Sequence, residues 1–233
     1  MSEASPIGRA LAHDSAIRHV TGEAVYVDDM PEPARCLEIY IAWATRAHAR
    51  VARLDLAAVR SAPGVVAVLI TADIPGVNDI SPVGRDDEPV FATGIVQYWG
   101  HALFAVAAPT VHAARAAAAL ASIEYEDLPP LLDVDEARAR EDHVWPPGRM
   151  QRGDAVRALA ASPCRLDGRI AIGGQDHFYL ETHIAYAIPG EDDDMVVHSS
   201  TQHPTEVQHH VAHVLGGLAN SVDVFTRRMG GGF

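Results

Sequence analysis

The residues best suited to chemistry lie between Gly173 and His183, in the sequence GGQDHFYLETH. This stretch combines two glycines, an amide, acidic groups, two histidines and two aromatic rings. Few packed cores need such a mixture. The glycine pair lets the backbone turn or lets another group come close. The polar and apolar residues that follow predict a segment that lines a site on one side and packs on the other.

A second glycine cluster, Gly230 to Gly232, follows a predicted strand at 221–227 and precedes Phe233. Glycines after a strand are typical of a loop that lets the backbone approach a ligand. Such a loop rarely finishes a domain. We therefore expect the motif, and the domain that contains it, to be incomplete in this chain.

Four histidines in and beside a predicted helix at 205–216 raise the question of a metal site. His209 and His213 are four residues apart and share one helix face, with His203 and His210 nearby. A zinc site needs three or four convergent ligands with supporting hydrogen bonds, and no carboxylate or cysteine stands at a suitable spacing. Solvated helix histidines are therefore the favoured interpretation.

Two further polar runs have simple interpretations. The acidic residues at 191–194 suggest a calcium site, but a solvated hairpin tip explains them better. The hydroxyl residues at 199–201 lie near histidines in sequence, which suggests a hydrolase. No nucleophile elbow of the G-x-S-x-G type accompanies them, so hydrolase chemistry is disfavoured.

The elements that must position these residues fall into two regions. In the first region, strands and helices alternate, which predicts a module of α+β or α/β type. Its strands are expected at 36–45, 65–71, 102–108 and 122–125, and its helices at 54–59 and 110–121. Thr110 is expected to cap the second of these helices.

The second region begins after a charged, proline-marked stretch at 141–152, which we predict to be a linker. Asp154 is expected to cap a helix that runs to about Ala161. Strands are predicted at 165–172, 183–188 and 221–227, and a helix at 205–216. The predicted domains are therefore residues 1–140, comprising an N-terminal arm and the mixed module, and residues 153–233.

The composition limits the classes of partner and the cellular location that we expect. Of the 233 residues, 48% are hydrophobic, which indicates a globular protein. The formal net charge of -13 argues against nucleic acid and anionic membrane surfaces as partners. Cys36 and Cys164 lie far apart, which suits reduced thiols better than a disulfide framework. No signal peptide and no long apolar run is evident, so we expect a cytoplasmic location.

Four segments together resemble the molybdenum-binding large subunit of the xanthine dehydrogenase family of molybdenum hydroxylases. The segments occur in the family's order from about residue 7 to the last residue. They are TGEAVYVDDMP at 21–31, GGQDHFYLETH at 173–183, SSTQHPTEVQHHVAHVLG at 199–216 and RRMGGGF at 227–233. The resemblance implies an α+β fold, with an α/β-hammerhead domain followed by an incomplete first molybdopterin-binding domain.

The resemblance also implies roles for four residues. Gln175 would hydrogen-bond the apical oxo ligand of molybdenum from outside its coordination sphere, and an amide does this without adding charge. Gly231, Gly232 and Phe233 would contact the cofactor through a glycine-rich loop, where a Cβ would obstruct the backbone amides. The family's general base and substrate-orienting residues lie in later segments, so we expect no catalytic residue in this chain and no activity from it alone.

The function implied is the oxidation of xanthine, hypoxanthine or a related heterocycle by water-derived hydroxylation. The intact enzyme would carry the molybdenum cofactor, with iron–sulfur clusters and FAD on partner modules; we expect none bound to this chain alone. Expected partners are a purine-like substrate, an iron–sulfur/FAD subunit and the remainder of the large subunit. Self-association through uncovered apolar faces is also expected. The alternative is a non-catalytic fragment or half-subunit that acts only in assembly.

This chain departs from the family pattern in two places. Gly100-His101-Ala102 stands where the family has a glutamine or glutamate and a proline after the glycine, and Asp176 stands where it has a glutamate. In the GGQDHFYLETH segment, Glu181 is expected to tie strands together and not to act in catalysis.

Overall fold

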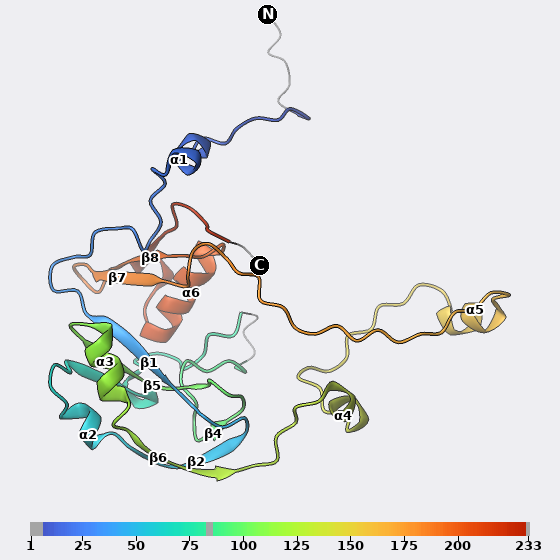
Figure 1. Cartoon of the computed structure of the whole chain (residues 1–233), viewed down its shortest axis with the longest axis horizontal. Helices are drawn as coiled ribbons and strands as arrows, with labels where there is room; N and C mark the ends of the chain where they lie inside the picture. Colours follow the sequence, from blue (N-terminus) through green and yellow to red (C-terminus); the bar gives the residue numbers. More distant parts are fainter. Residues whose placement is uncertain (1–6, 83–85, 232–233) are drawn as a thin grey trace, which may run out of the picture. The chain divides into compact units, whose positions relative to one another are not determined.

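The chain divides into two units. The computed structural model describes residues 7–82 and 86–231. One unit comprises residues 1–128 and 178–233, and the other comprises residues 129–177. Within the described part of the first unit, strands form three sheets of three strands each (Figure 1).

The first sheet has β5 at its centre. Its antiparallel strands run in the order β1 (Glu38–Trp43), β5 (Ala102–Ala108) and β3 (Ala67–Leu69). All residues of β5 except the first are buried, because a neighbouring strand lies on each side and helix α3 (Val111–Ala118) packs on one face. The helix contributes small alanines to the core, and these let it lie close to the sheet.

The outer strand β1 leaves large apolar side chains uncovered. Successive side chains of a strand point to opposite faces. Ala42 lies in the core and Tyr40 packs against it. The alternate residues, which we call the β1 row, are exposed by 40%, 52%, 37% and 49% at Leu37, Ile39, Ile41 and Trp43. An apolar face is therefore open beside a buried core.

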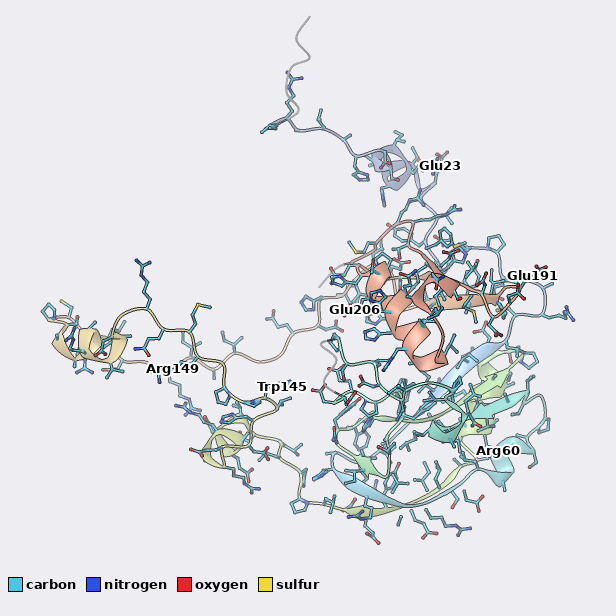
Figure 2. The ribbon with its side chains drawn as sticks, turned by 180° about the vertical axis from the view of Figure 1, so that it is seen from behind. Glu23, Arg60, Trp145, Arg149, Glu191 and Glu206 are labelled. Atoms are coloured by element: carbon cyan, nitrogen blue, oxygen red, sulfur yellow. The ribbon has the colours of Figure 1, made fainter. Side chains whose placement is uncertain are left out.

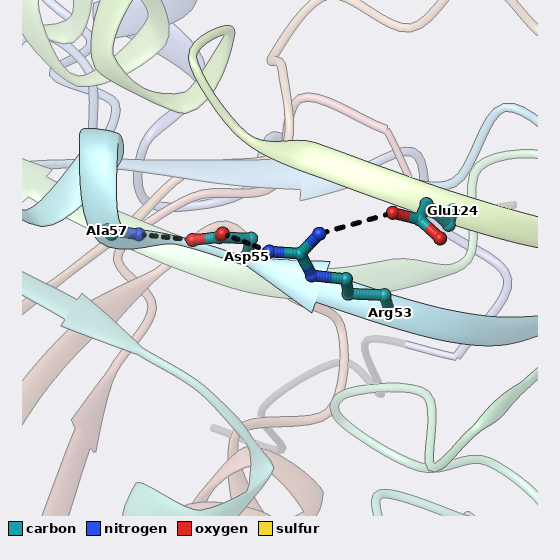
Figure 3. A network of polar contacts seen from close by, with 4 residues as sticks. All are labelled: Arg53, Asp55, Ala57 and Glu124. Atoms are coloured by element: carbon teal, nitrogen blue, oxygen red, sulfur yellow. Dashed lines mark hydrogen bonds and ion pairs between the residues drawn. The ribbon is translucent and has the colours of Figure 1, made fainter.

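The second sheet has the order β4 (Ile95–Val96), β2 (Ala49–Asp55) and β6 (Ser122–Asp127), with antiparallel pairing. Arg53 on β2 bonds Asp55 at 2.9 Å and reaches across to Glu124 on β6 at 3.3 Å (Figure 3). The Asp55 carboxylate also accepts from the backbone N–H of Ala57, the first residue of helix α2 (Ala57–Arg60). These groups are solvated, so each ion pair adds only roughly 0–1 kcal/mol.

The third sheet and helix α6 form a second core. Strand β7 (Ala185–Pro189) is antiparallel to β8 (Met195–Ser199), which is parallel to β9 (Val222–Phe225). Helix α6 (Pro204–Leu215) crosses between the two parallel strands, and η2 (Ala219–Ser221) follows it. Val197, Ala212 and Val222 form the buried cluster between helix and sheet. Figure 2 shows Glu206 on α6 and Glu191 at the β7–β8 turn.

A loop after η1 (Thr71–Asp73) joins the first part of this unit to α6. The N–H of Gly76 donates to the carbonyl of Val214 at 2.9 Å, and the N–H of Val77 donates to that of His213 at 3.1 Å. A Cβ on Gly76 would overlap the His213 carbonyl oxygen and lie 2.8 Å from the Cα of Gly216. Gly216 ends the helix in the left-handed region, with φ of 70°.

The unit of residues 129–177 has two short helices, α4 (Val134–Ala139) and α5 (Ala155–Ala161) (Figure 1). Asp133 caps α4 by accepting from the N–H groups of residues 135 and 136, and Asp154 caps α5 by accepting from that of Arg157. Trp145 and Arg149 mark the irregular segment between these helices (Figure 2).

The structure confirms the α+β class and corrects some elements. The helices predicted at 110–121 and 205–216 appear as α3 and α6, and the acidic residues 191–194 form the β7–β8 turn. The strand predicted at 165–172 is wrong: residues 163–177 form no regular element and are mostly exposed. A strand needs a neighbour for its ladder bonds, and no described strand pairs with this segment. Helix α1 (Ala16–Thr21) was not predicted.

Candidate functional site

Gln175 lies in an exposed, extended segment. Its neighbours Gly173 and Gly174 are also exposed, and a Cβ on either glycine would meet nothing within 4 Å. The amide of Gln175 is therefore accessible to a ligand. This segment belongs to the unit of residues 129–177.

The glycine-rich loop is described only in its first half. It follows β9, and Gly231 is exposed, whereas Gly232 and Phe233 lie outside the described residues. The cofactor contacts assigned by resemblance to Gln175, Gly231, Gly232 and Phe233 remain predictions.

In the first unit, Glu181 links several segments of the candidate site. One carboxylate oxygen, Oε1, accepts from the backbone N–H of Val27 at 3.2 Å, and the other, Oε2, accepts from that of Gly230 at 3.0 Å. Val27 is buried, and Glu181 and Gly230 are partly buried. Thus a single side chain joins three segments. They are the N-terminal segment around Val25 and Val27, which we call the arm, the end of the GGQDHFYLETH segment, and the start of the glycine-rich loop. Glu181 therefore has a structural role, but the segments that it joins are irregular and are not the strands expected from the sequence.

Gly230 makes an unusually close backbone contact with this segment. Its carbonyl oxygen accepts from the N–H of Leu180 at 3.0 Å and from that of Glu181 at 3.4 Å. A Cβ on Gly230 would overlap the Cβ of Glu181 and lie 2.7 Å from its backbone nitrogen. Glycine is required here because any side chain would force the two segments apart.

Arg228 provides a second link to the arm. Its Nη1 donates to the carbonyl oxygen of Val25 at 2.8 Å. The Nε atom of Arg228 is buried without a hydrogen-bond partner among the described residues. Residues 25 and 27 are therefore held by Arg228 and Glu181 respectively. We call the group of Val25, Val27, Glu181, Arg228 and Gly230 the arm–loop cluster.

The histidine-rich helix borders an open hollow of about 550 Å³. Its lining includes the start of α6 and Pro82, with His203, His209 and His210. His210 Nε2 lies 3.9 Å from a carboxylate oxygen of Glu206. Within residues 7–82 and 86–231, no three histidine, cysteine or acidic side chains gather to hold a metal ion.

Two buried polar groups near the first unit's loops have shifted pKa values. The hydroxyl of Ser81 donates to the buried Asp79 carboxylate at 2.5 Å, and this bond lowers the pKa of Asp79 despite its burial. His101 is 2% exposed, and burial lowers the pKa of its ring. Its Nδ1 accepts from the N–H of Gln97 at 3.4 Å, so the neutral ring carries its proton on Nε2. That buried Nε2 has no partner in the described structure.

Sequence reasoning found Glu181 but missed its partners. Val27 stands 154 residues from Glu181, and Arg228 stands 203 residues from its own partner Val25, so neither contact with the arm has a local signal. The glycine at position 230 was noted for a ligand, whereas the structure also explains it by backbone proximity to Glu181.

Comparison with known proteins decides the family. Residues 21–129 match the model of the α/β hammerhead domain of aldehyde oxidase and xanthine dehydrogenase, and residues 136–233 match that of the molybdopterin cofactor-binding domain. The chain therefore belongs to the aldehyde oxidase and xanthine dehydrogenase family. The domain limits expected from the sequence, at residues 140 and 153, remain a prediction.

Relatives in this family are similar along almost the whole chain. Xanthine dehydrogenase/oxidase of Gallus gallus is 40% identical over 97% of this chain, and that of Mus musculus is 37% identical over 100%. The chain spans 17% of the length of each of these relatives.

Solved structures support the fold. Aldehyde oxidoreductase from Desulfovibrio gigas matches 94% of this chain and 26% of its own, with a TM-score of 0.78 and 25% identity. Quinoline 2-oxidoreductase from Pseudomonas putida 86 matches 99% of this chain and 31% of its own, with a TM-score of 0.80 and 24% identity. The second likeness concerns the fold alone.

Proposed function

We propose that this chain supplies the hammerhead domain and the first part of the cofactor-binding domain to a molybdenum hydroxylase. Its substrate would be xanthine, hypoxanthine or a related heterocycle. The observation that carries the proposal is the identity of 37–40% to xanthine dehydrogenases along nearly all of the chain. The presence of both domains in sequence order supports it.

The residues available suit the molybdenum cofactor. The exposed amide of Gln175 offers a neutral donor to an oxo ligand, and the exposed Gly231 offers backbone without a side chain in the way. Neither group adds charge or competes as a metal ligand. Gln175, Gly231, Gly232 and Phe233 are therefore proposed to contact the cofactor.

The bound cofactor would supply the transfer of a water-derived oxygen to the ring carbon and accept two electrons from it. Iron–sulfur clusters and FAD would be held by a partner module. In this chain, the amide of Gln175 would hold the oxo ligand in place by donating a hydrogen bond. The general base and the substrate-orienting groups would come from the remainder of the large subunit.

A second candidate is an assembly module without catalysis. It is supported by the exposed β1 row, which offers an apolar surface to a partner. The two candidates differ in whether the chain holds molybdenum when it is joined to the later segments found in its relatives.

The experiment is to purify the chain alone and together with a polypeptide that supplies the relatives' later segments. Molybdenum content and xanthine-dependent dye reduction are measured for both. We expect neither from the chain alone, and both from the completed protein with its iron–sulfur/FAD module. A completed protein that folds yet lacks molybdenum would support the assembly candidate. Turnover by the isolated chain would contradict the division of roles.

Variants of Gln175 test the site itself. In the completed protein, Gln175→Ala is expected to lower kcat about tenfold or more, because the transition state loses a positioned donor. Gln202→Ala removes an exposed amide beside α6 and serves as the matched control. Equal kcat values for the two variants would remove Gln175 from the site.

A cytoplasmic location is also proposed. Every helix in the described parts of the chain is too short or too polar to span a bilayer. Cys36 and Cys164 carry free thiols. Fractionation of cells that express the tagged completed protein would test the location.

A further inference from the structure

Gly230 is held from both sides by one short segment. Its N–H donates to the Glu181 carboxylate at 3.0 Å, and its carbonyl accepts from Leu180 at 3.0 Å and from Glu181 at 3.4 Å. Both backbone polar groups of the residue that opens the glycine-rich loop are therefore satisfied by residues 180–181. The next residue, Gly231, is exposed. The path of the loop up to Gly231 is thus set by this contact.

We propose that Glu181 is a positioning residue that fixes the start of the glycine-rich loop and, through it, the backbone at Gly231. The role toward the cofactor rests on the proposed function, because only there does Gly231 meet a ligand. The contact between Glu181 and Gly230 is a property of the chain itself. It can be measured without any cofactor.

The chemistry of this position calls for a carboxylate. Glu181 uses one oxygen for Val27 and the other for Gly230, so it needs two acceptors and no donor. A glutamine offers one oxygen, and its NH₂ group would face an N–H donor. An aspartate is shorter by one methylene group, so its carboxylate would not reach both donors from the same backbone position. Hydrogen bonds to an ionised acceptor are also stronger than those to a neutral one.

The arm completes the arrangement. Arg228 donates to the carbonyl of Val25 two residues before the loop begins, and Glu181 accepts from Val27. The arm is therefore bonded to the chain just before Gly230 and to the carboxylate that holds Gly230. Displacement of the arm would release one of the two bonds made by Glu181. The loop position consequently depends on the arm as well as on the carboxylate.

A role confined to general stability is the competing explanation. It predicts that a change at Glu181 lowers the melting temperature and leaves the local protection of Gly230 relative to other amides unchanged. The positioning role predicts a local effect at Val27, Gly230 and Gly231. It also predicts faster loss of cofactor from the completed protein.

The experiment compares Glu181→Gln with Glu191→Gln, an exposed glutamate at the β7–β8 turn. Amide hydrogen exchange of the 233-residue chain is measured by NMR. Exchange at Val27 and Gly230 is expected to quicken about tenfold or more in Glu181→Gln, because each amide loses a charge-assisted bond or has it weakened. Glu191→Gln is expected to leave both amides unchanged. Unchanged exchange at Gly230 in Glu181→Gln would overturn the proposal.

A second variant keeps the test open if Glu181→Gln does not fold. Gly230→Ala leaves the carboxylate intact but forces the loop away from residue 181. It is expected to quicken exchange at the amides of Leu180 and of residue 230 by a similar factor. Protection equal to that of the wild type would show that the close contact does not exist and would overturn the proposal.

A measurement of cofactor loss separates this inference from the proposed function. Molybdopterin released from the completed protein is followed by its fluorescence after oxidation. A rate of loss about tenfold higher in Glu181→Gln, with a melting temperature near that of the wild type, would support positioning. An unchanged rate would overturn it. If the wild type holds no molybdopterin, the proposed function fails, and the exchange result alone decides whether Glu181 sets the loop.

Discussion

His101 is a buried base, and the protonation of its ring should change the free energy of unfolding. Its Nε2–H has no partner among the described residues, and its ring stacks on Tyr98 with centroids 4.5 Å apart. Burial disfavours the charged imidazolium, which lowers the pKa of His101 below its ordinary value of 6.5. The unfolded chain therefore binds a proton more readily than the folded chain as the pH falls below this value.

We accordingly predict a loss of stability on the acid side that depends on His101. Each unit by which the folded pKa lies below the unfolded pKa corresponds to about 1.4 kcal/mol, fully present above the unfolded pKa and lost as pH falls through the folded pKa. Urea unfolding at pH 7.5, 6 and 5 measures it. His101→Gln should flatten the dependence, whereas His112→Gln, on an exposed position of α3, should not. Parallel curves for wild type and His101→Gln would contradict this assignment.

Asp79 contributes to acid sensitivity in a different pH range. Its bond to Ser81 lowers its pKa below the ordinary 3.8, so the stability from Asp79 is present above that value and lost as pH falls through the lower folded pKa. The two losses of stability can be separated by pH. The loss from His101 begins near the ordinary pKa of a histidine, and the loss from Asp79 begins near the ordinary pKa of a carboxyl group.

At the level of elements, the contact between the 75–77 loop and α6 depends on two glycines. Gly76 lies against the helix end at Gly216, where the left-handed conformation turns the chain away. Two backbone hydrogen bonds, from Gly76 and Val77 to the last turn of α6, complete the contact. The loop can dock only if its backbone has no Cβ at residue 76.

Gly76→Ala is predicted to undock this loop. Two hydrogen bonds of about 1 kcal/mol each would be lost, so the free energy of unfolding should fall by roughly 2 kcal/mol or more. Gly217→Ala is the matched control, because a Cβ there would meet nothing within 4 Å. Chemical denaturation gives the free energies, and limited proteolysis reports the loop. Similar values for the two variants would show that the loop does not rest on the helix as described.

The elements that could be predicted from the sequence are those with local signals. Thr110 caps α3 through the N–H of Ala113, and the glycine after Leu215 ends α6. The segment at 165–172 was mispredicted because its apolar residues suit a strand but strand formation depends on a partner elsewhere in the chain.

The candidate site was predictable only in part for the same reason. The GGQDHFYLETH segment was found because its residue types are unusual, and the glycines at 230–232 were found because they follow a predicted strand. The bonds from Glu181 to Val27 and from Arg228 to Val25 cross 154 and 203 residues, and no periodicity or spacing encodes them. Such contacts are known only once the fold is known.

At the level of the whole molecule, the β1 row offers an apolar surface through which copies of the chain can associate. Ile39, Ile41 and Trp43 of the outer strand β1 form a line of apolar side chains with Leu37, which directly precedes the strand. Outer strands with such faces promote pairing between molecules. The net charge of -13 opposes association at low salt and does so less as salt screens it.

We predict that the isolated chain self-associates, more strongly at high salt. Ile39→Glu should reduce association, because it places a charge in the β1 row. Leu166→Glu is the control, since Leu166 is 97% exposed and lies outside the row. Light scattering and hydrophobic-dye binding provide the measurements. A wild-type chain that remains monomeric and binds no dye at high salt would contradict the prediction.

The arm–loop cluster also sets an order of events during synthesis. Val25 leaves the ribosome 203 residues before Arg228, its hydrogen-bond partner. At roughly 5–20 residues per second, the arm waits about 10 to 40 s for that partner to be made. During this interval the sheets and helices encoded in between can pack, while the carbonyl of Val25 still lacks its bond to Arg228. The cluster therefore closes only after Arg228 and Gly230 have been made, later than the sheets and helices encoded before them.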